Sequence, residues 1–140
     1  MLKTILSISG KPGLYKLVSQ GKNMLIVETV SPEKKRMPAY AADRIISLGD
    51  IAMYTIDSEV PLADVLQAMK EKEQGKVAEI SPKKASAEEL RDYLEEVLPN
   101  FDRDRVYASD IKKLITWYNT LIENDITDFS EEEEEVTEDK

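Results

Sequence analysis

Between residues 4 and 57 the chain carries short apolar runs, rich in aliphatic and β-branched residues, that are separated by glycine, proline and polar residues. Runs of this length and composition predict β-strands. The turn residues Gln20, Gly21, Lys22 and Asn23 separate the first two runs and predict a β-hairpin. The five runs cover residues 14–18, 24–30, 37–40, 45–48 and 51–56.

Five short strands with no helical period between them predict a small antiparallel β-barrel of the SH3-like kind over residues 1–58. Pro38 confines the third run to an edge position, because proline cannot donate a hydrogen bond to a ladder. A closed barrel would pair most of the edges that such short strands otherwise expose. We therefore expect the run at 51–56 to complete the barrel.

The apolar period changes after Ser58. Apolar residues then recur at i, i+3, i+4 and i+7, which indicates an amphipathic helix over residues 59–75 that links the barrel to the rest of the chain. Gly75 is a natural end for this helix. Residues 76–85, which include Ser81 and Pro82, form the expected linker. The helical pattern consists of Leu62, Val65, Leu66 and Met69.

Two further helical stripes predict a small helical unit over residues 86–127. The first begins at Ser86, which forms a capping-box match with Glu89 three residues later. The second runs from Ile111 to Ile122 with apolar residues on one face. Residues 128–140 are rich in glutamate and low in complexity, which predicts a disordered acidic tail. The predicted fold class is α+β.

The composition excludes the commonest catalytic side chains. The 140 residues include no cysteine and no histidine, so thiol nucleophiles, imidazole bases and zinc–thiolate sites are impossible. We therefore expect a protein that is not an enzyme and that uses no metal and no cofactor. A chain without cysteine fits a reducing compartment, and no apolar run approaches the roughly 20 residues that span a bilayer. We expect a cytoplasmic protein with no membrane segment.

Charge is distributed unevenly along the chain, whose formal net charge is −9. Residues 1–58 carry a net charge of +3, residues 59–130 carry −6, and residues 131–140 carry a further −6. The front of the chain is therefore mildly basic and the back acidic. This asymmetry is the only global indication of a partner, and the sequence carries no prediction of the oligomeric state.

Two segments, in this order, resemble a known family. Residues 2–17 read LKTILSISGKPGLYKL and residues 105–119 read RVYASDIKKLITWYN. They are similar to a family of short bacterial proteins, filed as a domain of unknown function, and the resemblance covers about residues 1–125. It implies a bacterial cytoplasmic setting. It implies no activity and no site residues.

The first candidate site is a basic set on the expected barrel. Small barrels bind nucleic acid through loops in which cations contact phosphates and aromatic rings stack on bases. The alternative interpretation is a lysine-rich loop that keeps a strand edge soluble, and we favour it because a net charge of +3 is weak for a nucleic-acid-binding surface. The set consists of Lys34, Lys35, Arg36, Tyr40 and Arg44.

A run of acidic residues around Asp102 resembles the start of a calcium-binding loop. The continuation does not fit, because Arg105 stands where the loop needs glycine and Ile111 where it needs glutamate. We expect a local ion-pair network there, in which Arg103 or Arg105 pairs with the acidic side chains. The carboxylates of residues 88–96 lie on the polar face of their helix and are expected to be solvated.

The second candidate site is aromatic. The only tryptophan, Trp117, lies close to the apolar face of the last expected helix, and Tyr107 and Tyr118 are near it in sequence. Most aromatic residues in such positions belong to the core, whereas a tryptophan left partly exposed there would serve as an anchor for a protein partner. The two-part layout, the uneven charge and the absence of catalytic residue types make a non-enzymatic protein-interaction or adaptor module the leading hypothesis. The alternative is an RNA- or DNA-binding protein that uses the basic face of the barrel and is autoinhibited by the acidic tail.

Overall fold

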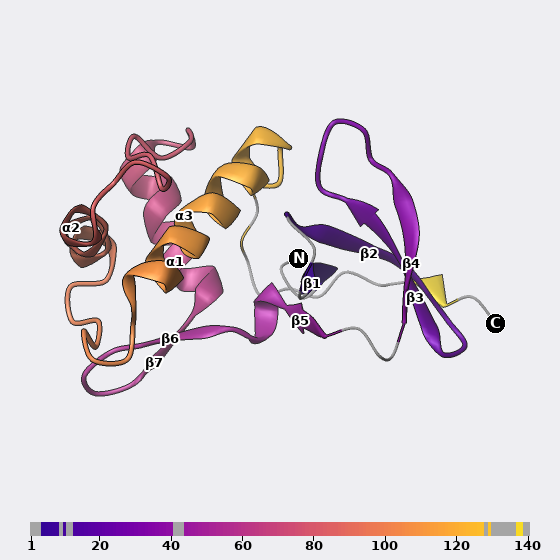
Figure 1. Cartoon of the computed structure of the whole chain (residues 1–140), viewed down its shortest axis with the longest axis horizontal. Helices are drawn as coiled ribbons and strands as arrows, with labels where there is room; N and C mark the ends of the chain where they lie inside the picture. The colour runs from indigo at the N-terminus through magenta and orange to yellow at the C-terminus, as the bar shows by residue number, and fades with distance from the viewer. Residues whose placement is uncertain are drawn as a thin grey trace.

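The structure is a computed structural model that describes residues 4–8, 10, 13–40, 44–127 and 129, together with the backbone of 137–138. The fold is α+β. An antiparallel sheet lies at one end of the long axis and three helices gather at the other (Figure 1). Within the described residues, no helix combines the length and the apolar character needed to cross a membrane.

The larger sheet contains five antiparallel strands in the order β4-β3-β2-β1-β5. The predicted hairpin is confirmed, because β2 and β3 pair from Tyr15–Thr29 to Gly21–Met24 and join through a turn at Asn23, whose φ is 65°. A bulge between Leu17 and Ser19 bends the hairpin. The strands are β1 (Ile5–Ile8), β2 (Tyr15–Gly21), β3 (Met24–Thr29), β4 (Arg36–Tyr40) and β5 (Ile45–Ser47).

The prediction of a closed SH3-like barrel is wrong. The sheet stays open, with β4 and β5 at its two edges. A short 3-10 turn, Leu48–Asp50, follows β5 and redirects the chain; there the Ser47 side chain accepts a hydrogen bond from the Gly49 amide at 3.2 Å. The next strand, β6 (Ala52–Tyr54), does not complete the barrel. It pairs instead with β7 (Glu59–Pro61) in a separate two-stranded sheet on the helical side (Figure 1).

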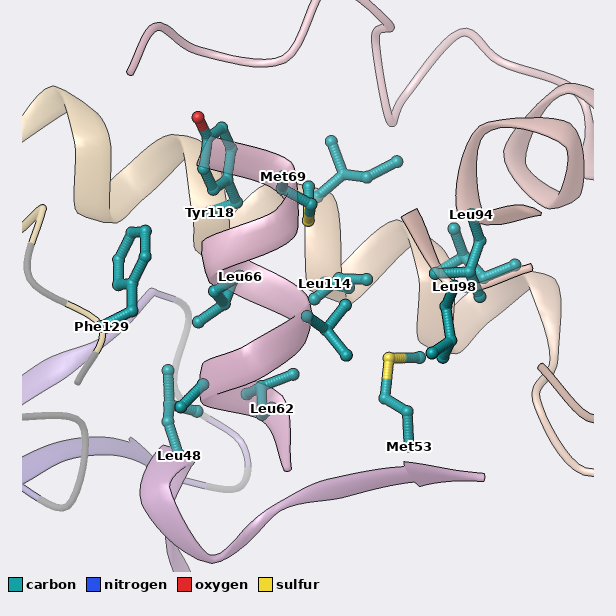
Figure 2. Packing of buried hydrophobic residues seen from close by; sticks show 14 of the residues in the cluster. Leu48, Met53, Leu62, Leu66, Met69, Leu94, Leu98, Leu114, Tyr118 and Phe129 are labelled. Atoms are coloured by element: carbon teal, nitrogen blue, oxygen red, sulfur yellow. The ribbon is translucent and has the colours of Figure 1, made fainter. Parts of the chain in front are cut away.

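Burial explains why β6 leaves the larger sheet. Met53, in the middle of β6, is only 7 % exposed and packs into the helical core. Figure 2 shows its side chain pointing from the strand toward Leu98. Burial of this side chain in the helical core favours this position of β6, and the hydrogen bonds of the strand go to β7 and to residues 100–102.

The three helices match the predicted apolar stripes. They are α1 (Leu62–Glu73), α2 (Ala87–Val97) and α3 (Ala108–Glu123). The predicted capping box of α2 is confirmed, with the Glu89 amide donating to Ser86 Oγ and the Ser86 amide donating to Glu89 Oε1, both at 3.1 Å. α1 ends at Gln74 and Gly75, which both have positive φ.

One hydrophobic core joins the helices to one face of the larger sheet, which contributes Ile5, Leu14 and Val30. A second, smaller cluster covers the opposite face and includes Leu6, Tyr15 and Val27. Partly buried residues of the same sheet, among them Leu25 and Met37, pack against this cluster.

The expected linker at residues 76–85 is attached to α3. The Tyr118 hydroxyl donates to the Lys76 carbonyl at 2.6 Å, and the Ala78 amide donates to Asn119 Oδ1 at 2.7 Å. Burial raises the pKa of Tyr118 to about 12, so this hydroxyl keeps its proton at neutral pH. The two contacts hold the start of the segment against the helical core.

The segment predicted as a disordered tail contains two described parts. Phe129 is 2 % exposed and its ring lies 6.2 Å from the ring of Tyr118. Thr137–Glu138 forms a short strand, β8, that pairs in parallel with Ser19 and Gln20 of β2. The rest of that prediction, at residues 128, 130–136 and 139–140, falls outside the described residues.

Candidate protein-interaction groove

A groove of about 230 Å³ lies between β6 and α3. Residues 51–54 form one wall, and residues of α3 and of the segment before it form the other. Small-molecule sites usually enclose roughly 300–1,000 Å³. The size therefore suits one or two side chains of a larger partner better than a whole small ligand.

The helical wall follows from the periodicity of α3. Asp110, Lys113, Leu114 and Trp117 are spaced at i, i+3, i+4 and i+7, which places them on one face of the helix. Leu114 is 1 % exposed and belongs to the core, whereas Trp117 is half-buried and packs against the edge of that core. Leu114 thus provides an apolar floor and Trp117 an apolar side of the groove.

The strand wall offers main-chain groups. The Thr55 amide donates to the Ser58 carbonyl at 2.8 Å and the Leu62 amide donates to the Ile51 carbonyl at 2.9 Å, which sets the register of the β6–β7 ladder. Hydrogen-bonded and non-hydrogen-bonded pairs alternate in an antiparallel ladder. The main-chain groups of Ala52 and Tyr54 therefore face away from β7, toward the groove.

Arg105 and Tyr54 form the rim at one end of the groove. The Arg105 guanidinium lies 4.6 Å from the centre of the Tyr54 ring, and its Nε donates to Asp102 Oδ2 at 2.8 Å. This hydrogen bond lowers the pKa of the Asp102 carboxyl, which also accepts from the Asp104 amide at 3.0 Å. The predicted ion-pair network is confirmed at this position, and it fixes the arginine over the tyrosine.

The three aromatic residues predicted to contact a partner have different positions. Trp117 lines the groove. Tyr107 is 61 % exposed at the start of α3 and lies outside the groove lining. Tyr118 is wholly buried, so its side chain presents no surface to a partner in this structure. Consecutive residues on a helix point about 100° apart, which turns Trp117 outward when Tyr118 faces the core.

The basic residues predicted to contact nucleic acid do not form one cluster. Lys34, Lys35 and Arg36 are exposed at the beginning of β4, and Tyr40 is 54 % exposed at its other end. Four residue steps along a strand separate Arg36 from Tyr40 by roughly 13 Å. Arg36 also lies 3.7 Å from Glu28 of the neighbouring strand. The fifth residue, Arg44, is exposed just before β5.

Sequence reasoning missed several residues of the groove, namely Ala52, Tyr54, Arg105 and Lys113. Ala52 contributes main-chain atoms, which leave no trace in side-chain chemistry. Arg105 was expected only as part of an ion-pair network. The available signal was the alternation of apolar Met53 with the more polar Tyr54 and Thr55 in the run at 51–56, which is compatible with a strand that has one accessible face.

The fold and groove define an α+β protein with an open antiparallel sheet joined to a helical unit that carries a small apolar groove. Residues 51–121 match a family model described as "Domain of unknown function (DUF6852)", and residues 2–48 match "Domain of unknown function (DUF5606)". The first match covers half of the chain, so the chain belongs to the DUF6852 family, and the two matches confirm the resemblance to proteins of unknown function found in the sequence. The boundary between the two matches coincides with the 3-10 turn before β6.

The chain is also similar to a solved bacterial structure. A solution NMR structure from Bacteroides vulgatus, determined by a structural genomics consortium, is 70 % identical in sequence and superposes with a TM-score of 0.77. The similarity covers 92 % of this chain and 91 % of that one. A search among curated proteins found no match. The function of the family is unknown.

Proposed function

We propose that this protein is a non-enzymatic protein-interaction module that acts in the bacterial cytoplasm and binds its partner in the groove between β6 and α3. The observation that carries the proposal is the half-buried Trp117 beside the apolar floor at Leu114. A tryptophan in this position loses water from its remaining exposed surface when a partner side chain fills the groove.

The residue types around the groove support this proposal. Binding energy at protein interfaces concentrates on tryptophan, tyrosine and arginine, and the groove brings together Trp117, Tyr54 and Arg105. Tyr54 is 38 % exposed and is already held in place by the Arg105 guanidinium. A side chain that is fixed before binding loses less conformational entropy on binding.

Two features of the chain argue against catalysis and in favour of binding. The sequence has no histidine and no cysteine, which removes the usual general base and thiol nucleophile. The absence of cysteine also fits a reducing compartment such as the cytoplasm. Two of the charged residues at the groove have structural partners, since Arg105 binds Asp102 and Asp110 accepts from the Tyr107 amide at 2.9 Å.

Affinity purification with matched variants tests the proposal. The tagged chain, Trp117→Ala and the control Tyr107→Ala are used to capture partners from bacterial lysate, with and without nuclease. We expect a discrete protein that survives nuclease, is retained by Tyr107→Ala and is lost by Trp117→Ala. Equal capture by both variants would exclude the groove, and recovery of nuclease-sensitive RNA or DNA would favour the basic residues at 34–36.

Intrinsic fluorescence gives a direct reading of the same site. Trp117 is the only tryptophan in the chain, so its emission reports the groove alone. We expect the emission maximum to shift to shorter wavelength as the purified partner excludes water from the indole. Binding that leaves the emission unchanged would place the partner elsewhere.

A further inference from the structure

We propose that the partner binds as an extended strand that pairs with the main chain of Ala52 and Tyr54, inserts an apolar side chain beside Trp117 and presents an acidic side chain to Lys113. This inference rests on the proposed function and specifies how the groove is used. Strand addition takes its affinity from main-chain hydrogen bonds and its specificity from pockets for alternate side chains.

The direction of the main-chain groups is the first support. Ile51 and Thr55 bond to Leu62 and Ser58, the residues that flank β7, and Met53 stands opposite Val60 in the same register, so the intervening residues present their peptide groups on the opposite side. Pro61, which stands opposite Ala52, has no N–H and fits this non-hydrogen-bonded pair. The N–H and C=O of Ala52 and the N–H of Tyr54 are therefore oriented for a further strand.

The chain itself already uses the adjoining stretch of this edge in the same way. The Asp102 amide donates to the Tyr54 carbonyl at 2.8 Å and the Ile56 amide donates to the Asn100 carbonyl at 3.0 Å, around an antiparallel bridge between Thr55 and Phe101. After Asp102 the chain turns away into α3, since the amide of Val106 donates back to the Asp102 carbonyl at 2.8 Å. The groove begins where this internal strand-like segment ends.

The helical wall determines which side chains the added strand needs. Alternate residues of a strand point to opposite faces of a sheet. Those that share the face of Met53 would point toward Leu114 and Trp117, which form an apolar surface with room for one or two side chains. This geometry calls for an apolar residue flanked by residues that face solvent.

Charge complementarity specifies a second residue that shares this face of the bound strand. Three charged residues line the groove, namely Arg105, Asp110 and Lys113. Arg105 is bonded to Asp102 and Asp110 caps α3. Within the described part of the chain, none of the ion pairs includes Lys113. Its ammonium group is exposed, and it attracts an acidic side chain of the bound strand.

Peptide selection with paired variants tests the inference. A phage-displayed library of random dodecapeptides is selected against the full chain, and the enriched peptides are titrated while Trp117 fluorescence is followed. We expect a consensus with an apolar residue and an acidic residue two positions apart, because residues at this spacing point to the same face of a strand. Ala52→Pro removes the outward N–H and should weaken binding about tenfold, whereas Ala52→Val keeps the N–H and should change affinity by less than about threefold.

Amide exchange of the unaltered protein provides a second measurement if Ala52→Pro does not fold. Binding should slow exchange at the Ala52 and Tyr54 amides by about tenfold or more. If peptides quench Trp117 but these amides exchange at the same rate, the groove remains a binding site and strand addition is wrong. If no enriched peptide depends on Trp117, the proposed function of the groove fails as well. A Lys113→Glu variant that binds acidic peptides unchanged would exclude the charge preference.

Discussion

The burial of Phe129 provides the most direct test of where the packed structure ends. Phe129 is 2 % exposed, lies against Tyr118 and belongs to the core shared by the helices and the sheet (Figure 2). Truncation of a buried phenylalanine to alanine costs about 3–5 kcal/mol. Native domains have unfolding free energies of about 5–15 kcal/mol, so Phe129→Ala should remove a large part of the stability.

Urea denaturation followed by far-UV circular dichroism measures this loss. Phe129→Ala should lower the free energy of unfolding by about 3–5 kcal/mol, and a thermal melt should shift by roughly 10–20 °C. Phe129→Leu preserves most of the apolar volume and should cost under about 1.5 kcal/mol. A loss below about 1 kcal/mol for Phe129→Ala would mean that the ring is solvated and that the packed chain ends before it.

Three further predictions concern the tyrosines and the C-terminal strand. Tyr118→Phe should lower the unfolding free energy by about 1–2 kcal/mol in urea melts, because the Lys76 carbonyl loses its donor; an unchanged value would contradict that contact. The folded state holds the Tyr118 pKa near 12 and also raises that of Tyr93 through burial and a hydrogen bond to a carboxylate. The tyrosines of the unfolded state therefore lose their protons at lower pH than those of the folded state. The unfolding free energy should fall above about pH 10, by up to about 1.4 kcal/mol per pH unit for each tyrosine. Tyr118→Phe should reduce this dependence on pH, and an equal dependence in the variant would refute the assignment of the raised pKa to Tyr118. Deletion of residues 136–140 should accelerate amide exchange only around residues 19–20, the partners of β8, and unchanged exchange would exclude this pairing in solution.

The local elements could be predicted because their signals lie within a few residues of each other. The turn at residues 20–23 joins two β-prone runs, and Ser86 and Glu89 form both hydrogen bonds of the predicted capping box. Each pattern depends on contacts between neighbours in sequence, so it can be recognised without knowledge of the tertiary structure. The partners of a strand depend instead on which distant surface buries its side chains.

Phe129 shows the same limit of local patterns, because its burial also depends on residues that are distant in sequence. Its neighbours in sequence are acidic and polar, and composition therefore placed it in a disordered tail. Its ring lies against Tyr118 in a core cluster that also includes residues of the sheet and of α1, and no local pattern describes that distant surface. A single aromatic residue after the last helix was the only signal that the packed chain continued.

Misassignment of the strand at 51–56 also hid the groove. A strand that completes a barrel has both edges paired, so the sequence interpretation left no free main-chain groups at Ala52 and Tyr54. In the structure Met53 is drawn to the helical core, and β6 has β7 on one side and the short segment at 100–102 on part of the other. The remaining edge lies beside Trp117, which periodicity had already selected as a partner contact. The groove therefore exists because the barrel does not close, and a substitution that returned β6 to the larger sheet would remove it.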